Sequence, residues 1–357
     1  MRIAMIGLPA SGKTTLFDAV TGHHEEPGAY AAPGSVHVGT VAVADERLDF
    51  LFERVFQPKR KVYAHVEFVD IGGLFTGGKP EPHAVEAMRD ADGLVKVVRA
   101  FASDALPHPK GSVDAARDLA DLNAELFIVD IDIIERRIDR LRVSVTKPTP
   151  RQEQEKAELA LLERCRAQLD TVGSLDRLEL TDDEAKMLRG FCFLTQKPSV
   201  TVINTGEEHL GGEQALLDSL GETHGPALAI DAELEKELLE LDPEEREPFM
   251  ADYGLAELSE HRLVNAALEA LDLITFFTGG DKEVRAWLLP RGSTAVEAAA
   301  SVHTDMARGF IRAEVVQVAD LREHGSFKDV RAAGRERLEG RDYVVQDGDV
   351  LHIRFSV

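Results

Sequence analysis

"GLPASGKTTLF", residues 7–17, follows a short apolar run at residues 3–6 and sets the expected fold of the first part of this chain. Residues 7–14 match G-x-x-x-x-G-K-[ST], a phosphate-binding loop that joins a strand to a helix. The preceding run has the composition of a buried strand, and residues 15–20 continue with a helical pattern. The order of strand, loop and helix predicts a phosphate-binding loop; an ordinary glycine-rich turn is the alternative.

The residue types in this loop fit the chemistry of a bound triphosphate. Its glycines allow backbone N–H groups to surround a phosphate, and the helix N-terminus favours negative charge. Lys13 is expected to bridge β- and γ-phosphate oxygens and is the first candidate catalytic residue, while the Thr14 hydroxyl is a candidate magnesium ligand. The predicted nucleotide-binding residues here are Pro9, Ala10, Ser11, Gly12, Lys13, Thr14 and Thr15.

A second motif, "VEFVDIGG" at residues 66–73, ends an apolar run with a carboxylate and two glycines. A phosphate-loop domain needs a magnesium-side carboxylate at the end of a neighbouring strand, so Asp70 is the second candidate magnesium ligand. Gly73 is the second candidate catalytic residue, with its N–H sensing the γ-phosphate. Leu74 follows where Ras-type enzymes place a water-orienting glutamine, and its apolar side chain cannot polarise water, so hydrolysis by that route is not expected.

A third motif, Asn204-Thr205-Gly206-Glu207, follows the predicted buried strand at 198–204. Guanine-selective proteins place N-K-x-D at this point, and the aspartate accepts two hydrogen bonds from guanine. Glu207 is one methylene longer, and Thr205 replaces the stacking lysine, so weaker guanine selectivity is expected. Asn204 and Glu207 are therefore candidate base-binding residues; a polar strand-to-loop turn is the alternative interpretation.

The composition limits the possible partners. The chain has 357 residues, 44% of them hydrophobic, and a formal charge of −23. Such a charge repels polyanions, so any RNA contact must be local and sequence-specific DNA binding is not expected. The strip "QPKRKVY" at residues 57–63 is the local basic candidate; a solvent-exposed strand edge is the alternative. No apolar stretch approaches the ~20 residues that span a bilayer, and two cysteines without metal spacing fit a reducing compartment. We expect a cytoplasmic protein without membrane contact.

Changes in periodicity along the chain predict three parts. Short strand-like runs alternate with helical patterns up to residue 112 and again over 196–272, as in an α/β domain. Residues 113–195 contain two helical patterns separated by "TKPTPRQ", which predicts an antiparallel helical hairpin inserted in that domain. Residues 273–357 are rich in predicted strands around one short helix and are long enough to fold alone.

Several longer stretches resemble one family across the whole chain. "GLPxxGKTTLF", "VEFVDIGGL", N-x-x-E, "ADERLDFL", "FLTQKP", "FFTGGDKEVRAW", "HTDMARGFIRAEV" and "LEGRDYVVQDGDVLHIRFSV" together resemble the YchF or Obg-like ATPase family. The resemblance implies a P-loop domain of translation-factor type, a coiled-coil insertion and a C-terminal ubiquitin-like TGS module with a β-grasp fold. It also implies a preference for ATP over GTP, slow hydrolysis and association with ribosomes. By the same resemblance, Asp231 and Ala232 pass near the base, although the family more often has cysteine at the position of Asp231.

Some positions depart from this family pattern and identify the chain as a divergent member. Ala10 stands where the family normally has asparagine, which in related switches helps to hold an activating potassium ion. The magnesium-binding threonine of the first switch falls at Pro33, and the nearest hydroxyl, Ser35, is displaced by two residues. The second switch, residues 74–88, is also shortened. Because phosphoryl transfer depends on positioning and charge stabilisation, these departures are expected to reduce turnover more than affinity.

The sequence therefore favours a magnesium-dependent, ATP-binding nucleotide switch with slow ATP hydrolysis that depends on Lys13. Two alternatives stay open. One is a GTPase of the same class, if Glu207 still reaches guanine. The other is a nucleotide-gated adaptor that binds ATP with little or no hydrolysis, which is suggested by Ala10, Pro33 and Leu74. The resemblance adds the ribosome as a partner.

Overall fold

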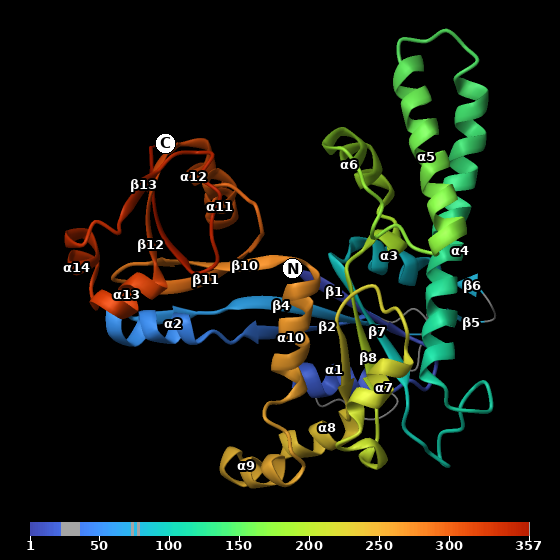
Figure 1. Ribbon diagram of the computed structural model, residues 1–357, viewed down its shortest axis with the longest axis horizontal. Coiled ribbons are helices and arrows are strands. Elements are labelled where there is room, and N and C mark those ends of the chain that lie inside the picture. The colour runs from blue at the N-terminus through green and yellow to red at the C-terminus, as the bar shows by residue number, and fades with distance from the viewer. Residues whose placement is uncertain (23–35, 73–74, 77–78, 357) are drawn as a thin grey trace. The chain divides into compact units, whose positions relative to one another are not determined.

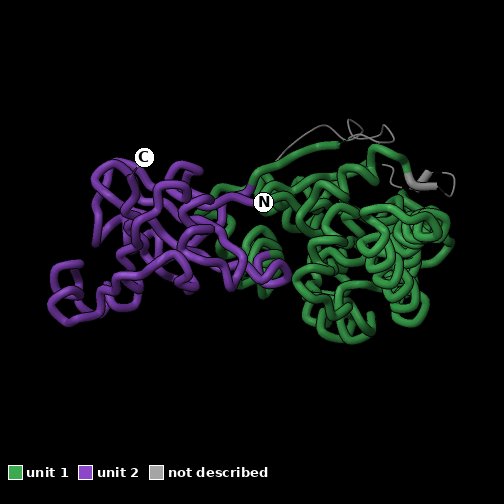
Figure 2. The backbone as a smooth tube through the Cα atoms, turned by 90° about the horizontal axis from the view of Figure 1, so that it is seen from above, with its two compact units in different colours: residues 1–40, 67–267 green, residues 41–66, 268–357 purple. Residues whose placement is uncertain are grey.

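The computed structural model describes residues 1–22, 36–72, 75–76 and 79–356. These residues form two compact units, one of residues 1–40 and 67–267 and the other of residues 41–66 and 268–357 (Figure 2). Over this part of the chain, no helix is both long enough and apolar enough to cross a membrane.

The first unit is built on a sheet with the strand order β2-β4-β1-β7-β8-β9. Strand β1 lies between β4 and β7 and is parallel to both, and β7, β8 and β9 continue in the same direction. Every residue of β7 and β8 is buried, as expected of strands covered on both faces. The strands are β1 (Arg2–Gly7), β2 (Val36–Val43), β4 (Ala64–Ile71), β7 (Gly93–Arg99), β8 (Ser199–Asn204) and β9 (Ala227–Ile230); a short pair, β5 (Phe75–Thr76) and β6 (Lys79–Pro80), is separate.

Helices cover this sheet and pack apolar residues against it. Ala84 and Met88 of α3 join Ala4 and Ile6 of β1 in one buried cluster, so α3 covers the centre of the sheet. Because β4, β1, β7, β8 and β9 are parallel, their carboxyl ends share one edge, where ligands of such folds bind. The helices around the sheet are α1 (Lys13–Thr21), α3 (Pro82–Asp90), α7 (Glu213–Ser219), α8 (Ala232–Glu240), α9 (Pro243–Asp252) and α10 (Ser259–Ala270).

Helices α4 (Ala115–Ser144) and α5 (Gln152–Val172) form the antiparallel hairpin that the sequence predicts (Figure 1). Their seam contains a buried cluster that includes Ile134, Ile138 and Cys165. The chain returns through α6 (Asp182–Leu188) and 3₁₀ turns at Arg189–Phe191 and Leu194–Gln196. Buried Asp130 of α4 ties the second of these turns to the hairpin by accepting hydrogen bonds from the backbone N–H groups of Leu194 and Thr195, at 3.0 and 2.8 Å.

The second unit contains a mixed sheet with the order β13-β12-β14-β10-β11-β3. Strands β10 and β14 are parallel, while β10–β11, β12–β14 and β12–β13 are antiparallel; α11 packs against the sheet, as in a β-grasp fold. The strands are β3 (Arg60–Val62), β10 (Leu273–Gly279), β11 (Glu283–Pro290), β12 (Phe310–Gln317), β13 (Arg337–Glu339) and β14 (Asp349–Phe355). The helices are α2 (Glu46–Phe50), which continues as a π-helical turn at Leu51–Phe56, α11 (Ala295–Val302), α12 (Thr304–Arg308), α13 (Val318–His324) and α14 (Phe327–Ala332).

Residues 41–66 do not belong to the domain in which the sequence analysis placed them. The expected limits assign residues 1–112 and 196–272 to the nucleotide-binding domain and 113–195 to an insertion. Residues 41–66 belong to the unit that contains 273–357, and the helical hairpin belongs to the first unit. The physical reason is strand pairing: β3 extends the second sheet in parallel with β11. The basic strip at 57–63 is therefore a sheet edge. Arg60 pairs with Glu283, and Lys61 with Asp49 at 2.6 Å, so these cations are already neutralised.

Candidate functional site

The phosphate loop lies between β1 and α1, at the carboxyl edge of the first sheet. The backbone N–H of Ser11 donates to the carbonyl of Leu8 at 3.2 Å, which closes the turn. Gly12 directly precedes α1 as its N-cap with φ +77°, and a Cβ there would overlap the side-chain amide of Asn204. Glycine is thus required at this position for both its backbone conformation and its small size. Pro9 is exposed, and Thr15 lies in the first turn of α1.

Lys13, Thr14 and Asp70 converge at the end of β4. The Thr14 hydroxyl donates to Asp70 Oδ2 at 2.8 Å, and the ammonium of Lys13 forms an ion pair with Asp70 Oδ1. Asp70 is buried, and burial lowers the pKa of Lys13 to about 7. The adjacent carboxylate opposes that shift because it favours the charged ammonium. The three predicted phosphate and metal residues are therefore in direct contact.

Asn204 connects the phosphate loop to the base side of the site. Its Nδ2 donates to the carbonyl of Ser11 at 3.0 Å, and its Oδ1 accepts from the backbone N–H of Ala232 at 3.2 Å. The side chain is buried at the end of β8. Asn204 thus joins three segments that are far apart in sequence.

A pocket of about 410 Å³ lies beside the phosphate loop, within the first unit. Gly12, Thr15 and Asn204 form one part of its lining, and Phe101 and Leu106 supply apolar surface. Glu207 is exposed and lines the same pocket. A pocket that combines apolar surface with several polar groups can receive a small molecule. The remaining lining residues are mostly acidic or small: Ala102, Ser103, Thr205, Gly206, Glu208, Asp231, Glu233, Leu234 and Glu237.

Asp231 and Ala232 lie where the pocket meets the start of α8. The carboxylate of Asp231 caps this helix by accepting from the backbone N–H of Leu234 at 3.1 Å. Burial raises the pKa of Asp231, and the nearby charges of Glu207 and Glu208 act in the same direction. Asp231 therefore has a structural role as a helix cap in addition to lining the pocket.

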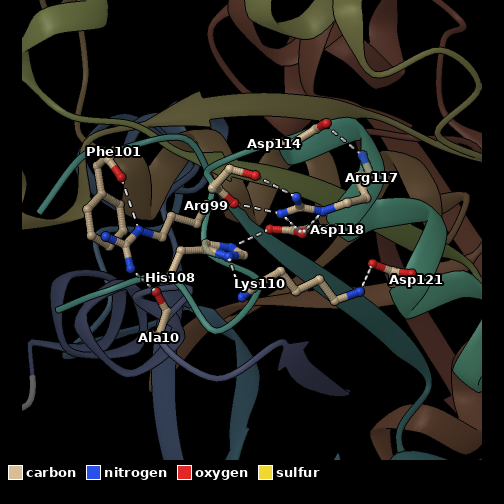
Figure 3. Close-up of polar contacts among 10 residues, drawn as sticks. Ala10, Arg99, Phe101, His108, Lys110, Asp114, Arg117, Asp118 and Asp121 are labelled. Atoms are coloured by element: carbon tan, nitrogen blue, oxygen red, sulfur yellow. Dashed lines mark hydrogen bonds and ion pairs between the residues drawn. The ribbon is translucent and has the colours of Figure 1, made fainter.

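Two residues at this site, Arg99 and Phe101, are not anticipated by the sequence analysis. Arg99 ends β7 and is buried, and it donates from Nη1 to the carbonyl of Ala10 at 3.3 Å (Figure 3). Phe101 lines the pocket two residues later. The signal available in the sequence was an arginine at the end of a mostly apolar strand, where a buried cation needs a specific partner.

Several predicted residues lie outside the described part of the chain. These are Gly73, the candidate sensor of the γ-phosphate, with Leu74, Pro33 and Ser35 of the two switches. Their roles stay predictions. Among the described residues, no group of three or more His, Cys, Asp or Glu side chains is arranged to hold a metal ion. The candidate magnesium ligands Thr14 and Asp70 are a hydroxyl and a single carboxylate, which form part of a ligand set.

A strand-to-helix phosphate loop, a buried lysine, a threonine–aspartate pair and a pocket at the next strand ends define a P-loop nucleotide-binding fold. The chain belongs to the YchF family. It is 36% identical over 364 residues to the ribosome-binding ATPase YchF of Pasteurella multocida, covering 100% of this chain and 99% of that protein. The protein of the same name from Bacillus subtilis is 34% identical, covering 99% and 98%. The family model YchF-GTPase_C, described as "Protein of unknown function (DUF933)", matches residues 273–356.

Solved structures agree with this membership. The Schizosaccharomyces pombe YchF GTPase is similar to this chain with a TM-score of 0.84 and 27% identity, covering 99% of this chain and 97% of that one. A GTP-binding protein from Pyrococcus horikoshii OT3 shares the fold at a TM-score of 0.63 and 20% identity, covering 100% of both chains. The expected class, a P-loop domain with a C-terminal β-grasp domain, is confirmed.

Proposed function

We propose that this protein is a magnesium-dependent, ATP-binding nucleotide switch that hydrolyses ATP slowly and associates with ribosomes. The observation that carries this proposal is the convergence of Lys13, Thr14 and Asp70 at a phosphate loop whose neighbouring pocket contains Glu207. The names of the relatives, ribosome-binding ATPases, support the same activity and partner.

In this proposal, the phosphate loop and Lys13 bind the triphosphate. Amide groups of the loop and the N-terminus of α1 favour the negative charge, and Lys13 leaves Asp70 to contact β- and γ-phosphate oxygens. The oxygen donors of Thr14 and Asp70 fit magnesium, which prefers oxygen ligands and usually binds through one or two carboxylates together with substrate phosphates. When bound, the ion neutralises charge on the phosphates. Gly73 is proposed to sense the γ-phosphate through its N–H.

The preference for ATP is proposed to come from the acidic side of the pocket. Adenine presents an exocyclic amino group that a carboxylate can accept from, whereas guanine selectivity uses a shorter aspartate that accepts from two N–H groups at once. Glu207 is too long by one methylene to reproduce that arrangement, and Asn204 is already bonded to Ser11 and Ala232.

A GTPase of the same class is the second candidate function. The name of the similar Schizosaccharomyces pombe protein, a YchF GTPase, favours it. A binder with little or no hydrolysis is the third candidate, and Ala10 supports it because an alanine side chain cannot ligate an activating ion.

Phosphate release from ATP by purified protein, with Lys13→Ala as the control, tests the proposed activity. We expect slow, magnesium-dependent release by the wild type and none above background by Lys13→Ala. Equal release by both proteins would remove the ATPase proposal. Nucleotide binding without any release would favour the adaptor.

Co-sedimentation with purified ribosomes tests the proposed partner. We expect the amount of bound protein to depend on whether ATP, a nonhydrolysable analogue or no nucleotide is present. Absence of the protein from the ribosomal pellet in all three conditions would contradict the association.

A further inference from the structure

Arg99 is a buried cation that contacts the phosphate loop at Ala10 and the pocket wall at Phe101. The side chain is 2% exposed, and its Nε donates to the carbonyl of Phe101 at 3.0 Å. Its Nη1 donates to the carbonyl of Ala10 at 3.3 Å, and the guanidinium carbon lies 4.2 Å from the centroid of the Phe101 ring (Figure 3). Within the described residues, no carboxylate forms an ion pair with it.

This arrangement is unusual for an arginine. Buried charges in proteins are normally paired, because removing an unpaired ion from water is costly. Two backbone carbonyls and an aromatic face satisfy part of the guanidinium but leave its charge without a counter-ion. A triphosphate bound at the neighbouring loop would provide negative charge close to this cation.

The carbonyl that Arg99 holds belongs to a backbone position of restricted conformation. Ala10 has φ +63°, in the left-handed region that residues with a Cβ rarely adopt. The next carbonyl, that of Ser11, is held by Asn204 from the end of β8. Two consecutive peptides of the phosphate loop are therefore fixed by buried side chains from the ends of two neighbouring strands.

We propose that Arg99 is a positioning residue that holds the phosphate loop and the Phe101 side of the base pocket as one unit. The inference rests on the proposed nucleotide-binding function. Through Ala10, Arg99 fixes the loop that receives phosphates; through Phe101, it fixes a surface available to a nucleobase. Loss of Arg99 therefore weakens the binding of the phosphates even when no base is present.

The test compares wild type with Arg99→Met and Arg99→Lys by calorimetric titration with ATP and with tripolyphosphate, both in magnesium. Methionine removes both hydrogen bonds and the charge; lysine keeps the charge but lacks the planar fork that reaches both carbonyls. We expect Arg99→Met to weaken binding of both ligands by about ten- to hundredfold, the effect of losing a hydrogen bond from a charged group. Arg99→Lys is expected to fall between Arg99→Met and wild type.

Hydrogen exchange provides a readout that a general loss of stability does not reproduce. We expect faster exchange of backbone amides in residues 7–14 of both variants, with little change in α5 or in the second unit. If only Arg99→Met fails to fold, Arg99→Lys still gives this comparison.

Lys197→Met is the matched control. Lys197 also donates to two backbone carbonyls, those of Arg89, at 2.9 Å, and Ala91, and it belongs to the same unit. Its removal is expected to lower stability and leave the affinity for both ligands within about twofold of wild type.

Unchanged affinity in both Arg99 variants would overturn the inference, as would a loss no larger than that of Lys197→Met or faster exchange over the whole chain. These results are distinct from a failure of the proposed function, which would show as absence of ATP binding by the wild type.

Discussion

At the scale of single residues, Asn204 shows how one buried amide organises the site. It donates to the phosphate loop at Ser11 and accepts from the start of α8 at Ala232. Its amide also occupies the space in which a side chain at Gly12 would lie. A residue with three such neighbours contributes both to stability and to the shape of the loop.

Asn204→Ala is expected to lower the free energy of unfolding by about 1–3 kcal/mol, because it leaves a buried carbonyl and a buried N–H without partners. It is also expected to weaken ATP binding. Chemical denaturation and calorimetry measure the two effects. Asn123→Ala, the same change on α4, is the control and should alter neither quantity strongly. Wild-type ATP affinity in Asn204→Ala would contradict the proposed contribution of Asn204 to ATP binding.

Glu207→Asp tests the proposed basis of nucleotide preference. Shortening the side chain by one methylene restores the acid that guanine-selective proteins use, so GTP affinity should rise relative to ATP affinity. The measurement is the ratio of the two dissociation constants by calorimetry. Glu208→Asp is the control, since the Glu208 carboxylate is bonded to the backbone N–H of Ala102 at 3.1 Å. If the ratio is unchanged in Glu207→Asp, or if the preference for ATP increases, Glu207 does not determine the nucleotide preference.

The sequence predicts those site residues whose chemistry is carried by local spacing. Lys13, Thr14 and Asp70 could be chosen because each lies at or just after the end of a strand in a known pattern, and the structure brings them into contact. Arg99 could not be chosen in this way, since its partners are backbone carbonyls and a ring that become neighbours only after folding. The helix-capping role of Asp231 also depends on where α8 begins, and boundaries are poorly defined by composition.

At the scale of elements, β7 has a charged residue inside a buried strand. Lys96 is 6% exposed, and burial lowers its pKa to about 8, while the charge of Asp176 acts in the opposite direction. Since the unfolded chain has the ordinary value of 10.5, the unfolded state binds more protons between about pH 8 and 10.5. The free energy of unfolding therefore rises with pH across this window. Below it, the buried Lys96 is charged in the folded state and its full destabilising effect is present.

Lys96→Met is expected to raise the free energy of unfolding at pH 7 by about 1–3 kcal/mol, because it removes a buried ammonium. This advantage should shrink as the pH rises from about 8 to 10, where the wild-type lysine becomes neutral in the folded state. Denaturation curves at pH 7 and 9.5 provide the measurement. The exposed Lys282→Met should show little difference at either pH, and a pH-independent effect at Lys96 would contradict the interpretation.

The long elements were predicted well and the short ones were not. The hairpin was expected from two helical patterns separated by "TKPTPRQ", and α4 and α5 confirm it. The sequence predicts one short helix in residues 273–357, whereas α13 and α14 have seven and six residues, too few to show a helical period. Their formation depends on packing against the β-grasp sheet.

At the scale of the whole molecule, residues 41–66 contribute to the second unit although they lie between strands of the first. No composition change marks this, because strand pairing between β3 and β11 joins residues more than 200 positions apart. Phe56 packs against Gly279, whose missing side chain leaves room for the ring, and lies 5.2 Å from Phe327 between centroids. The second unit thus depends on both parts of the chain.

Phe56→Ala is expected to destabilise the second unit by about 1–3 kcal/mol through loss of this half-buried aromatic packing. ATP affinity should be unchanged, since the proposed nucleotide-binding residues belong to the first unit. Thermal denaturation and calorimetry measure the two quantities. Phe249→Ala, at a ring that is 50% exposed, is the control. Wild-type stability of Phe56→Ala would show that residues 41–66 are not integral to the second unit.

In the function proposed above, the phosphate loop and its neighbouring pocket bind ATP in preference to GTP. Calorimetric titration of the purified protein with each nucleotide in magnesium, repeated with Lys13→Ala, tests it most directly. We expect tighter binding of ATP and loss of that binding in Lys13→Ala. Tighter binding of GTP, or ATP binding that survives in Lys13→Ala, would contradict it.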